Sequence, residues 1–327
     1  MPLSLRQGVV TAVVERQPEL VRLEVDGVAC VAYPRVTGPV ELGDDVLVNE
    51  QARLLGLGSG GFDVLHANLT RGLGLPAAEG AHVISLPYTP MQAAVRYLEE
   101  DGPLAEDLDG MPIVCCSLHS QVAPVCAALA PARVAYVQLG GGALPVSLSD
   151  TVRVLKERGL IEVAVAVAPC HDADAQAVTT ASALAWVRAW GYEVAVCAIG
   201  PGIVGTGTSL GHGGVAAAEA ANTATALGGR AVVAARVSSG DERERHRGLS
   251  HHTRTVLQLC LGEVTLAWPT GLDHPGVPVE EADVGGWKDA CAGLPLSHMG
   301  RGPDADAWFF AAAFAAGRVA ARLRPAA

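Results

Sequence analysis

The chain has 327 residues, half of them hydrophobic, and a formal net charge of −11. This length exceeds what one ordinary core holds and predicts one large domain together with a small one. Lys156 and Lys288 are the only lysines, and the acidic balance excludes the cationic surface that nucleic-acid binding requires, so we expect no nucleic-acid partner.

The cysteines and the hydropathy pattern predict a cytoplasmic protein without membrane contact. Eight cysteines lie in apolar segments and form no Cys-x-x-Cys pair, which is typical of reduced, buried thiols. The N-terminus lacks the pattern of a signal peptide, and the longest uncharged apolar stretch, around residues 307–316, is too short to span a bilayer.

Residues 1–75 predict a small β-barrel of the OB or SH3 type. Short runs alternate between apolar and polar positions, and turn sequences such as Asp26-Gly27 separate them. A passage rich in glycine and proline, residues 56–76, follows, and we place the domain boundary between residues 75 and 76. The expected strands are residues 9–14, 20–25, 28–33 and 46–49.

Residues 76–327 predict an α/β domain, because continuous apolar runs alternate here with alanine-rich segments of helix length. Strands that are apolar at every position are buried on both faces, so this pattern predicts a mostly parallel, Rossmann-like sheet with helices on both faces. The expected strands are residues 82–86, 112–118, 134–139, 161–168, 194–199, 231–237 and 264–268, and the expected helices are residues 147–158, 174–190, 215–227 and 251–261.

A last helix is predicted at residues 304–323. Aromatic side chains mostly serve burial, so we expect its rings to pack in the core or against a second subunit, and we expect a homodimer. These residues are Trp308, Phe309, Phe310 and Phe314.

Ligands of open parallel sheets bind at the carboxyl ends of the strands. Five of the predicted strands are followed by glycines or by residues with ionisable or hydroxyl groups, which predicts a site at this edge. These residues are Ser117, His119 and Ser120; 140–142; Cys170, His171, Asp172 and Asp174; 200–214; and Ser238, Ser239, Gly240 and Asp241.

Residues 200–214 contain seven glycines directly after a predicted strand. The spacing matches the dinucleotide fingerprint and approximates a P-loop, but Thr206 stands where the P-loop lysine belongs, and several glycines would fall inside a Rossmann helix. A long loop with a helix start near Val215 is more consistent. We predict anion binding by the loop's N–H groups, with a purely structural connection as the alternative. The predicted anion-binding residues are Gly200, Gly202, Gly205, Thr206, Gly207 and Thr208, together with Gly141 and Arg247.

A second polar cluster spans residues 241–253. Ser250 is expected to cap a helix that begins with His251 and His252, and these consecutive histidines are expected to point in different directions. The arginines of this segment alternate with acids and form either a solvated face or an anion clamp. They are Arg243, Arg245 and Arg247. The predicted acid–base residues of the site are His119, His212, Asp241 and His251.

Metal ligands and a nucleophile are harder to assign. A metal site is conceivable at His171, Asp172, Asp241 and His251, but no spaced ligand motif occurs, so we predict no metal. No Gly-x-Ser-x-Gly elbow is present, and the nucleophile stays open among the residues near histidines, which are Ser117, Ser120, Cys170 and Ser250. The remaining histidines are expected to be structural: His66, His82, His274 and His298.

Five motifs occur in the order YTPMQ at 88–92, LHSQ at 118–121, GGGALP at 140–145, GPGIVGTGT at 200–208 and HRGLSHHT at 246–253. With these motifs the chain resembles, over nearly its whole length, an uncharacterised bacterial family catalogued as a domain of unknown function, number thirty-eight sixty-six. The resemblance implies no activity. Relatives carry Gly-His and paired glycines where this chain has Cys-His-Asp-Ala-Asp at 170–174, which leaves the role of His171 open.

The leading hypothesis is an α/β enzyme that binds a small molecule bearing a phosphate or carboxylate group. Hydrolysis or group transfer is the expected chemistry, because imidazole, carboxylate and hydroxyl groups suit proton transfer. A non-catalytic sensor of a nucleotide or metabolite is one alternative, and an NAD-dependent oxidoreductase is another. The sequence identifies no cofactor.

Overall fold

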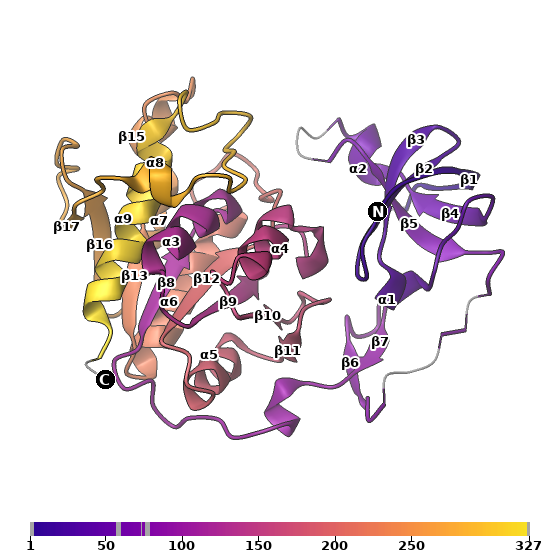
Figure 1. Ribbon diagram of the computed structural model, residues 1–327, viewed down its shortest axis with the longest axis horizontal. Coiled ribbons are helices and arrows are strands. Elements are labelled where there is room, and N and C mark those ends of the chain that lie inside the picture. Colours follow the sequence, from indigo (N-terminus) through magenta and orange to yellow (C-terminus); the bar gives the residue numbers. More distant parts are fainter. Residues whose placement is uncertain (1–2, 57–59, 73, 76–78, 326–327) are drawn as a thin grey trace. The chain divides into compact units, whose positions relative to one another are not determined.

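The computed structural model describes residues 3–56, 60–72, 74–75 and 79–325 (Figure 1). The chain divides into two compact units, Met1–Arg96 and Tyr97–Ala327. The domain boundary between residues 75 and 76 stays a prediction, and residues 76–78 lie outside the described part of the chain. No helix within the described ranges is both long and apolar enough to cross a membrane.

The first unit contains a closed five-stranded barrel, which confirms the predicted small β-barrel. Alternate residues of its strands, such as Val10, Leu23 and Val46, face a common apolar core. The strands lie in the order β1-β2-β3-β5-β4. They are β1 (Leu5–Arg16), β2 (Val21–Val25), β3 (Val28–Ala32), β4 (Asp45–Asn49) and β5 (Asp63–Asn68), accompanied by the short helices α1 (Pro34–Thr37) and α2 (Gln51–Leu54).

The strand predicted at residues 82–86 does not belong to the parallel sheet. It is β6 (Val83–Ser85), which pairs antiparallel with β7 (Ala93–Val95) in a separate two-stranded sheet of the first unit. The connection between them is shorter than the dozen or so residues that a parallel crossover needs. Ile84 is also half exposed, so the apolar run here is not a doubly buried strand.

The second unit contains an eight-stranded sheet in which every pair of neighbours is parallel, as the apolar runs predicted. Its order is β11-β10-β9-β12-β8-β13-β16-β17. The strands are β8 (Pro112–Cys116), β9 (Val134–Leu139), β10 (Val163–Val167), β11 (Ala175–Ala177), β12 (Val194–Ile199), β13 (Arg230–Ala234), β16 (Val264–Pro269) and β17 (Glu280–Ala282). A further short hairpin joins β14 (Val237–Ser238) to β15 (Gly248–Leu249).

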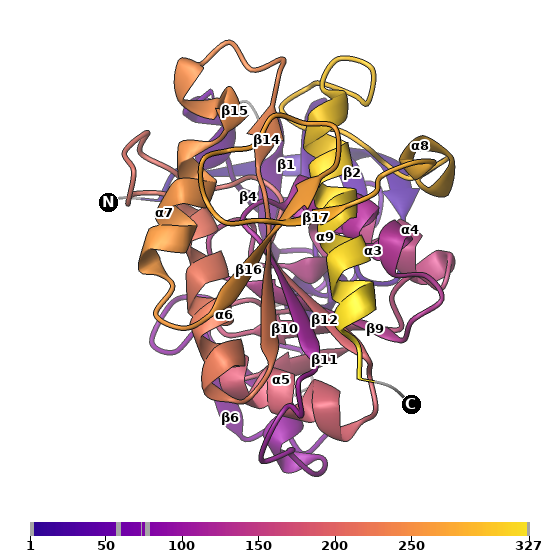
Figure 2. The ribbon, with the colours of Figure 1, turned by 90° about the vertical axis from the view of Figure 1, so that its left-hand side faces the viewer.

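Helices cover both faces of this sheet, as predicted (Figure 2). One face packs against α5 (Thr180–Ala189), α6 (Ala216–Ala226) and α7 (His251–Leu259). The other face packs against α3 (Val122–Leu129), α4 (Asp150–Glu157) and α9 (Ala307–Leu323), with α8 (Trp287–Ala290) beside them. The aromatic residues of α9 lie in the core, where Phe309, Phe310 and Phe314 are almost fully buried. The homodimer stays a prediction.

The connections of the central strands leave the sheet on opposite faces. The helix that follows β8 is α3, whereas the helix that follows its neighbour β12 is α6, on the other face. Such a switch opens a crevice at the carboxyl ends of the strands, where α/β sheets bind their ligands. The loops that follow β8, β12 and β13 are therefore the part of the fold that positions a site.

Candidate functional site

The site is built where the chain leaves the carboxyl end of β13. Arg236 follows this strand, and the β14–β15 hairpin then frames a loop that leads into α7. Ser250 caps α7 by accepting a hydrogen bond from the backbone N–H of His252, as its position predicted. The cap fixes where the first residues of α7 stand relative to Arg236.

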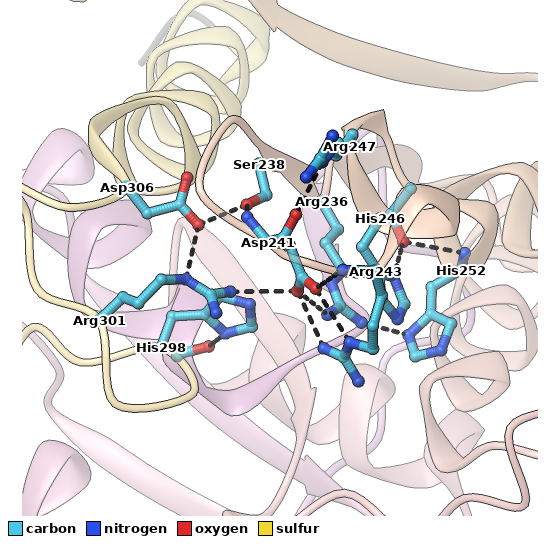
Figure 3. A network of polar contacts seen from close by, with 12 residues as sticks. Arg236, Ser238, Asp241, Arg243, His246, Arg247, His252, His298, Arg301 and Asp306 are labelled. Carbon is cyan, nitrogen blue, oxygen red and sulfur yellow. Dashed lines mark hydrogen bonds and ion pairs between the residues drawn. The ribbon is translucent and has the colours of Figure 1, made fainter.

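Arg236 is the centre of the site, and only 2% of it is exposed (Figure 3). Its Nη1 donates to Nδ1 of His252 over 2.8 Å, and its backbone N–H donates to the Thr253 hydroxyl. Burial, followed by the charge of Arg243, lowers the pKa of Arg236 to about 10, so the guanidinium stays charged at neutral pH. Its Nε–H is buried without a partner among the described residues, and buried donors normally have one.

Asp241 holds the guanidinium groups in place. Its buried carboxylate accepts two hydrogen bonds of 2.9 Å from Arg243 and one of 3.1 Å from Arg301, and it lies 3.7 Å from Arg236. The hydrogen bonds from Arg243 hold the pKa of Asp241 well below its ordinary value. A carboxylate that stays ionised in this way is a poor proton-transfer group, so the geometry favours an anchoring role for Asp241 over the predicted acid–base role.

A second buried carboxylate, Asp306, fixes the other side of Arg301. It accepts hydrogen bonds from the hydroxyl of Ser238 over 2.6 Å and from the backbone N–H of Ser239 over 3.1 Å, and Nε of Arg301 lies 3.4 Å away. Figure 3 shows Asp306 and Asp241 on opposite sides of the Arg301 guanidinium. Three arginines therefore contact two buried acids, which leaves these five residues with one more positive than negative charge.

Four histidines lie together beside Arg236, and we call them the histidine cluster: His212, His246, His251 and His252. The ring of His212 stacks on that of His252 at 3.7 Å, and the rings of His251 and His252 meet edge to face at 4.5 Å. The expectation that His251 and His252 point apart is therefore wrong. Both occupy the first turn of α7, where the rings of adjacent residues can lean toward the same neighbours.

The histidines of the cluster are neutral at neutral pH. Burial, followed by the charge of Arg236, lowers the pKa of His252 to about 2 and that of His246 to about 3. Burial likewise lowers the pKa values of His212 and His251. Neutral imidazoles can accept or donate a proton, so His212 and His251, both predicted as acid–base residues, lie in a setting that suits such a role.

His246, His251 and His252 also form a possible metal site, since one ligand atom from each lies within 4.8 Å of the others. This set differs from the one that the sequence suggested, and Asp172 is instead bonded to the hydroxyl of Ser147. An arginine only donates, so Nδ1 of His252 must accept and its proton must sit on Nε2. Neither nitrogen of His252 then has a lone pair for a metal. The cluster with its arginines fits an anion better than a cation.

The loop before α9 adds His298 to the site. His298 and Arg301 pair across a tight turn through two backbone hydrogen bonds, and the His298 ring stacks flat on Phe309 at 3.8 Å. Nδ1 of His298 lies 3.2 Å from the Ser120 hydroxyl, whereas its Nε2 is buried without a partner in the described part of the chain. Nε2 of His251 is likewise buried and unpartnered there.

His119 is engaged elsewhere. Its Nδ1 lies 3.1 Å from the carbonyl oxygen of Ile199, and its Nε2 lies 2.6 Å from the hydroxyl of Ser149, which caps α4. Burial lowers the pKa of His119 to about 4. Because both ring nitrogens have partners, His119 joins the loops that follow β8, β9 and β12, and it does not contact the histidine cluster through these bonds.

The glycine-rich segment 200–214, which we call the glycine loop, contains tightly packed residues at its ends and an exposed hairpin between them. Gly141 packs against the backbone of Gly213, and Gly200 packs against that of Ala143. Between them, an isolated bridge pairs Gly205 with His212, and the hairpin residues around it are exposed. Its hydroxyls bond within the hairpin, Thr206 to Thr208 over 3.0 Å and both to Gly211. Helix α6 begins at Ala216, which confirms the predicted late start.

The remaining predicted anion ligands are placed as follows. Gly202 and Gly207 adopt positive φ angles of 71° and 82° in the hairpin. Arg247 donates from Nε to the backbone carbonyl of Asp241 over 3.0 Å and so borders the site. Anion binding by the glycine loop stays a prediction.

The close approach of Gly141 gives a testable prediction. Its φ is +127°, and a Cβ there would lie 2.7 Å from the carbonyl oxygen of Gly213, so we expect Gly141→Ala to destabilise the protein by about 1–3 kcal/mol. Gly207→Ala is the control, because Gly207 also has a positive φ but nothing lies within 4 Å of its Cβ position. Urea unfolding of both variants measures the difference. Equal losses would contradict a packing role.

A cavity of about 300 Å³ lies at the same edge of the sheet, between the starts of α5 and α6. Its lining is about as polar as it is apolar: Leu139, Val167 and Pro169 lie at the strand ends, and Thr180 and Glu219 also line it. Gly213, the residue after His212, also borders it. The cavity therefore offers room for part of a small molecule beside Gly213, although no residue of the histidine cluster lines it.

The fold defines a two-unit protein, an α/β domain with a parallel sheet preceded by a small barrel. The chain belongs to the family described as "Protein of unknown function (DUF3866)", which matches residues 29–284. This confirms the resemblance that the motifs indicated. No curated protein matches the chain. Arg236, Asp241 and the histidine cluster fall within the matched region, whereas His298, Arg301 and Asp306 follow it.

Sequence reasoning missed Arg236, His298 and Arg301. The sequence carries a signal for Arg236, since it is the one charged residue in the apolar run at 231–237, which predicts a continuous strand. The strand β13 in fact ends at Ala234, and Arg236 is at the strand end where ligands bind. His298 and Arg301 follow no predicted strand, so no local pattern marks them.

Proposed function

We propose that the protein binds a small molecule bearing a phosphate or carboxylate group at Arg236 and the histidine cluster, and that it catalyses hydrolysis or group transfer there. One observation carries this proposal: the buried Nε–H of Arg236 has no partner among the described residues, although it lies in a network rich in arginine. A charged donor buried in this way calls for an acceptor that a ligand would supply.

The neighbouring groups support an anion in particular. His252 presents an N–H from Nε2, because Arg236 occupies its Nδ1. Asp241 and Asp306 are already bonded to arginines and hydroxyls, so they hold the cationic groups rather than compete for them. His212 and His251 would then move protons at the bound group, since both are neutral in this setting.

Binding is tested by thermal unfolding of the full chain with inorganic phosphate and with citrate. We expect either anion to raise the Tm increasingly as its concentration exceeds its Kd, because a ligand at 100 times its Kd stabilises by about 2.7 kcal/mol. Arg236→Lys keeps the charge but removes the guanidinium, and we expect it to abolish the shift.

Arg254→Lys is the matched control, because Arg254 is an exposed arginine on α7. This control should shift with phosphate as the unmodified protein does. If both variants respond equally, the anion does not bind at Arg236. If binding is found and a panel of phosphate and carboxylate esters shows no turnover, the protein is a sensor rather than an enzyme.

A further inference from the structure

Ser120 stands at the turn between the central strand β8 and helix α3. The chain leaves β8 at Cys116 and forms a short 3-10 turn, His119–Gln121, before α3 begins at Val122. Ser120 is partly exposed in this turn. A serine on a strand-to-helix turn at the carboxyl edge of a parallel sheet is placed where a nucleophile can meet a ligand bound at that edge.

The fold pairs Ser120 with a histidine 178 residues away in sequence. The Ser120 hydroxyl lies 3.2 Å from Nδ1 of His298, which is within reach for proton transfer. The His298 ring is held in position by its stack on Phe309 and by the turn with Arg301, and only 3% of the residue is exposed. With its proton on Nε2, His298 can accept the serine proton at Nδ1.

A second serine–histidine pair in the same unit shows what distinguishes this one. Ser149 lies 2.6 Å from Nε2 of His119, but only 3% of Ser149 is exposed, and its oxygen already accepts the N–H of Val152 as the cap of α4. Ser149 is therefore closed to a ligand. Ser120 also has a histidine partner, but it is partly exposed to solvent.

We propose that Ser120 is a catalytic nucleophile and that His298 is its general base, acting on a carboxylic ester that also carries a phosphate or carboxylate group. The proposal rests on the proposed function, because the anionic group of this substrate would bind at Arg236. Ser120 belongs to the LHSQ motif at 118–121, whereas His298 lies outside all five motifs and is brought to Ser120 by the loop before α9.

The reaction balances without a cofactor. The Ser120 oxygen bonds to the carbonyl carbon of the ester, and its proton passes to Nδ1 of His298. The bond between that carbon and the alcohol oxygen breaks, and the alcohol leaves with this proton. Water then attacks the acyl-serine, gives a proton to His298 and releases the acid, and the proton returns to the oxygen of Ser120.

The surroundings of His298 make this base dependent on the anion. Burial, followed by the charges of Arg236 and Arg301, lowers the pKa of His298 to about 3, and Asp241 and Arg243 are the other charged groups that act on it. Such an imidazole is a weak base while the site is unoccupied. An anion on Arg236 offsets the positive charge and raises the basicity of His298, so the nucleophile becomes active when an anionic substrate is bound.

A fluorophosphonate probe tests this assignment on the full chain in the presence of inorganic phosphate, with the labelled residue located by mass spectrometry. We expect the label on Ser120, no label on Ser120→Ala, and unchanged labelling of Ser149→Ala. His298→Gln should slow labelling about 100-fold or more, since general bases contribute about 10²–10⁴-fold. Labelling of Ser120 should also accelerate with phosphate concentration in the unmodified protein.

Label on another residue, absence of label, or equal rates for His298→Gln and the unmodified protein would each overturn the assignment. Thermal unfolding of each variant identifies one that fails to fold, and Ser120→Ala, a small change at a partly exposed position, then decides the labelled site. If phosphate raises the Tm but Ser120 is not labelled, the proposed anion site is supported and the proposed role of Ser120 as nucleophile is rejected. If Ser120 is labelled at a rate that does not change with phosphate, and phosphate does not raise the Tm, the proposed anion site and the dependence of His298 on it are rejected.

Discussion

Replacement of Asp241 by asparagine should be among the most damaging single changes in this protein. The carboxylate is 2% exposed and is bonded to Arg243 and Arg301, with Arg236 close by. Removal of one partner from a buried ion pair leaves an uncompensated charge and costs about 3–5 kcal/mol, and here more than one arginine loses its partner. We expect a fall of at least this size in the free energy of unfolding, measured by urea denaturation.

Asp304→Asn is the control for Asp241→Asn. Asp304 also forms an ion pair, with Lys288 over 2.9 Å, but both side chains are exposed. Exposed pairs contribute little, so we expect no measurable change in stability. Similar losses in the two variants would show that the arginine network does not depend on Asp241.

The protein should lose stability as the pH falls from about 6.5 toward 4. His246, His252 and His298 have folded-state pKa values of about 3, 2 and 3, against an ordinary value of 6.5. Below pH 6.5 these histidines bind protons in the unfolded chain but stay neutral in the folded chain. Protonation therefore stabilises the unfolded state, and the free energy of unfolding decreases as the pH falls. At pH 5 each of these three histidines costs about 2 kcal/mol, or about 6 kcal/mol together, and His119, whose pKa is lowered to about 4, adds to this loss.

Urea unfolding at pH 7.5 and pH 5 measures this loss. His252→Gln removes one of the histidines with a lowered pKa, so the difference between the two pH values should shrink in this variant. The carboxylate of Asp241 does not account for such a loss, because its lowered pKa keeps it ionised at pH 5. Stability that is equal at the two pH values would show that the histidines are not buried in the neutral form.

The parts of the fold that could be predicted are those that local patterns determine. Strand β12 has the limits that the sequence predicted, residues 194–199. It is buried on both faces, so every position is apolar and the apolar run marks where the strand begins and ends. The edge strands β11 and β17 were not predicted. Each has only three residues, and only one of the three is fully buried. Too few residues repeat there for a period to be visible.

The candidate site was predictable only in outline. The strand-end rule led to Asp241, and the polar segment 241–253 that begins there led to His251. The contact of Ser120 with His298 and that of Asp241 with Arg301 cross long stretches of chain, and no spacing within one segment encodes them. The role expected of Asp241 also depended on a contact that the sequence could not place, since the hydrogen bonds from Arg243 keep its carboxylate ionised.

The position of α9 has a consequence for how the protein can be divided. The family match ends at residue 284, but α9 covers one face of the sheet and packs against α3, and the loop before it supplies Arg301 and Asp306. A fragment that ends at residue 284 would expose the apolar face that α9 covers, and it would lack Arg301 and Asp306, which contact the residues that follow β13. The smallest portion that can be produced as a stable, intact α/β body therefore extends through Leu323, nearly forty residues past the recognised segment.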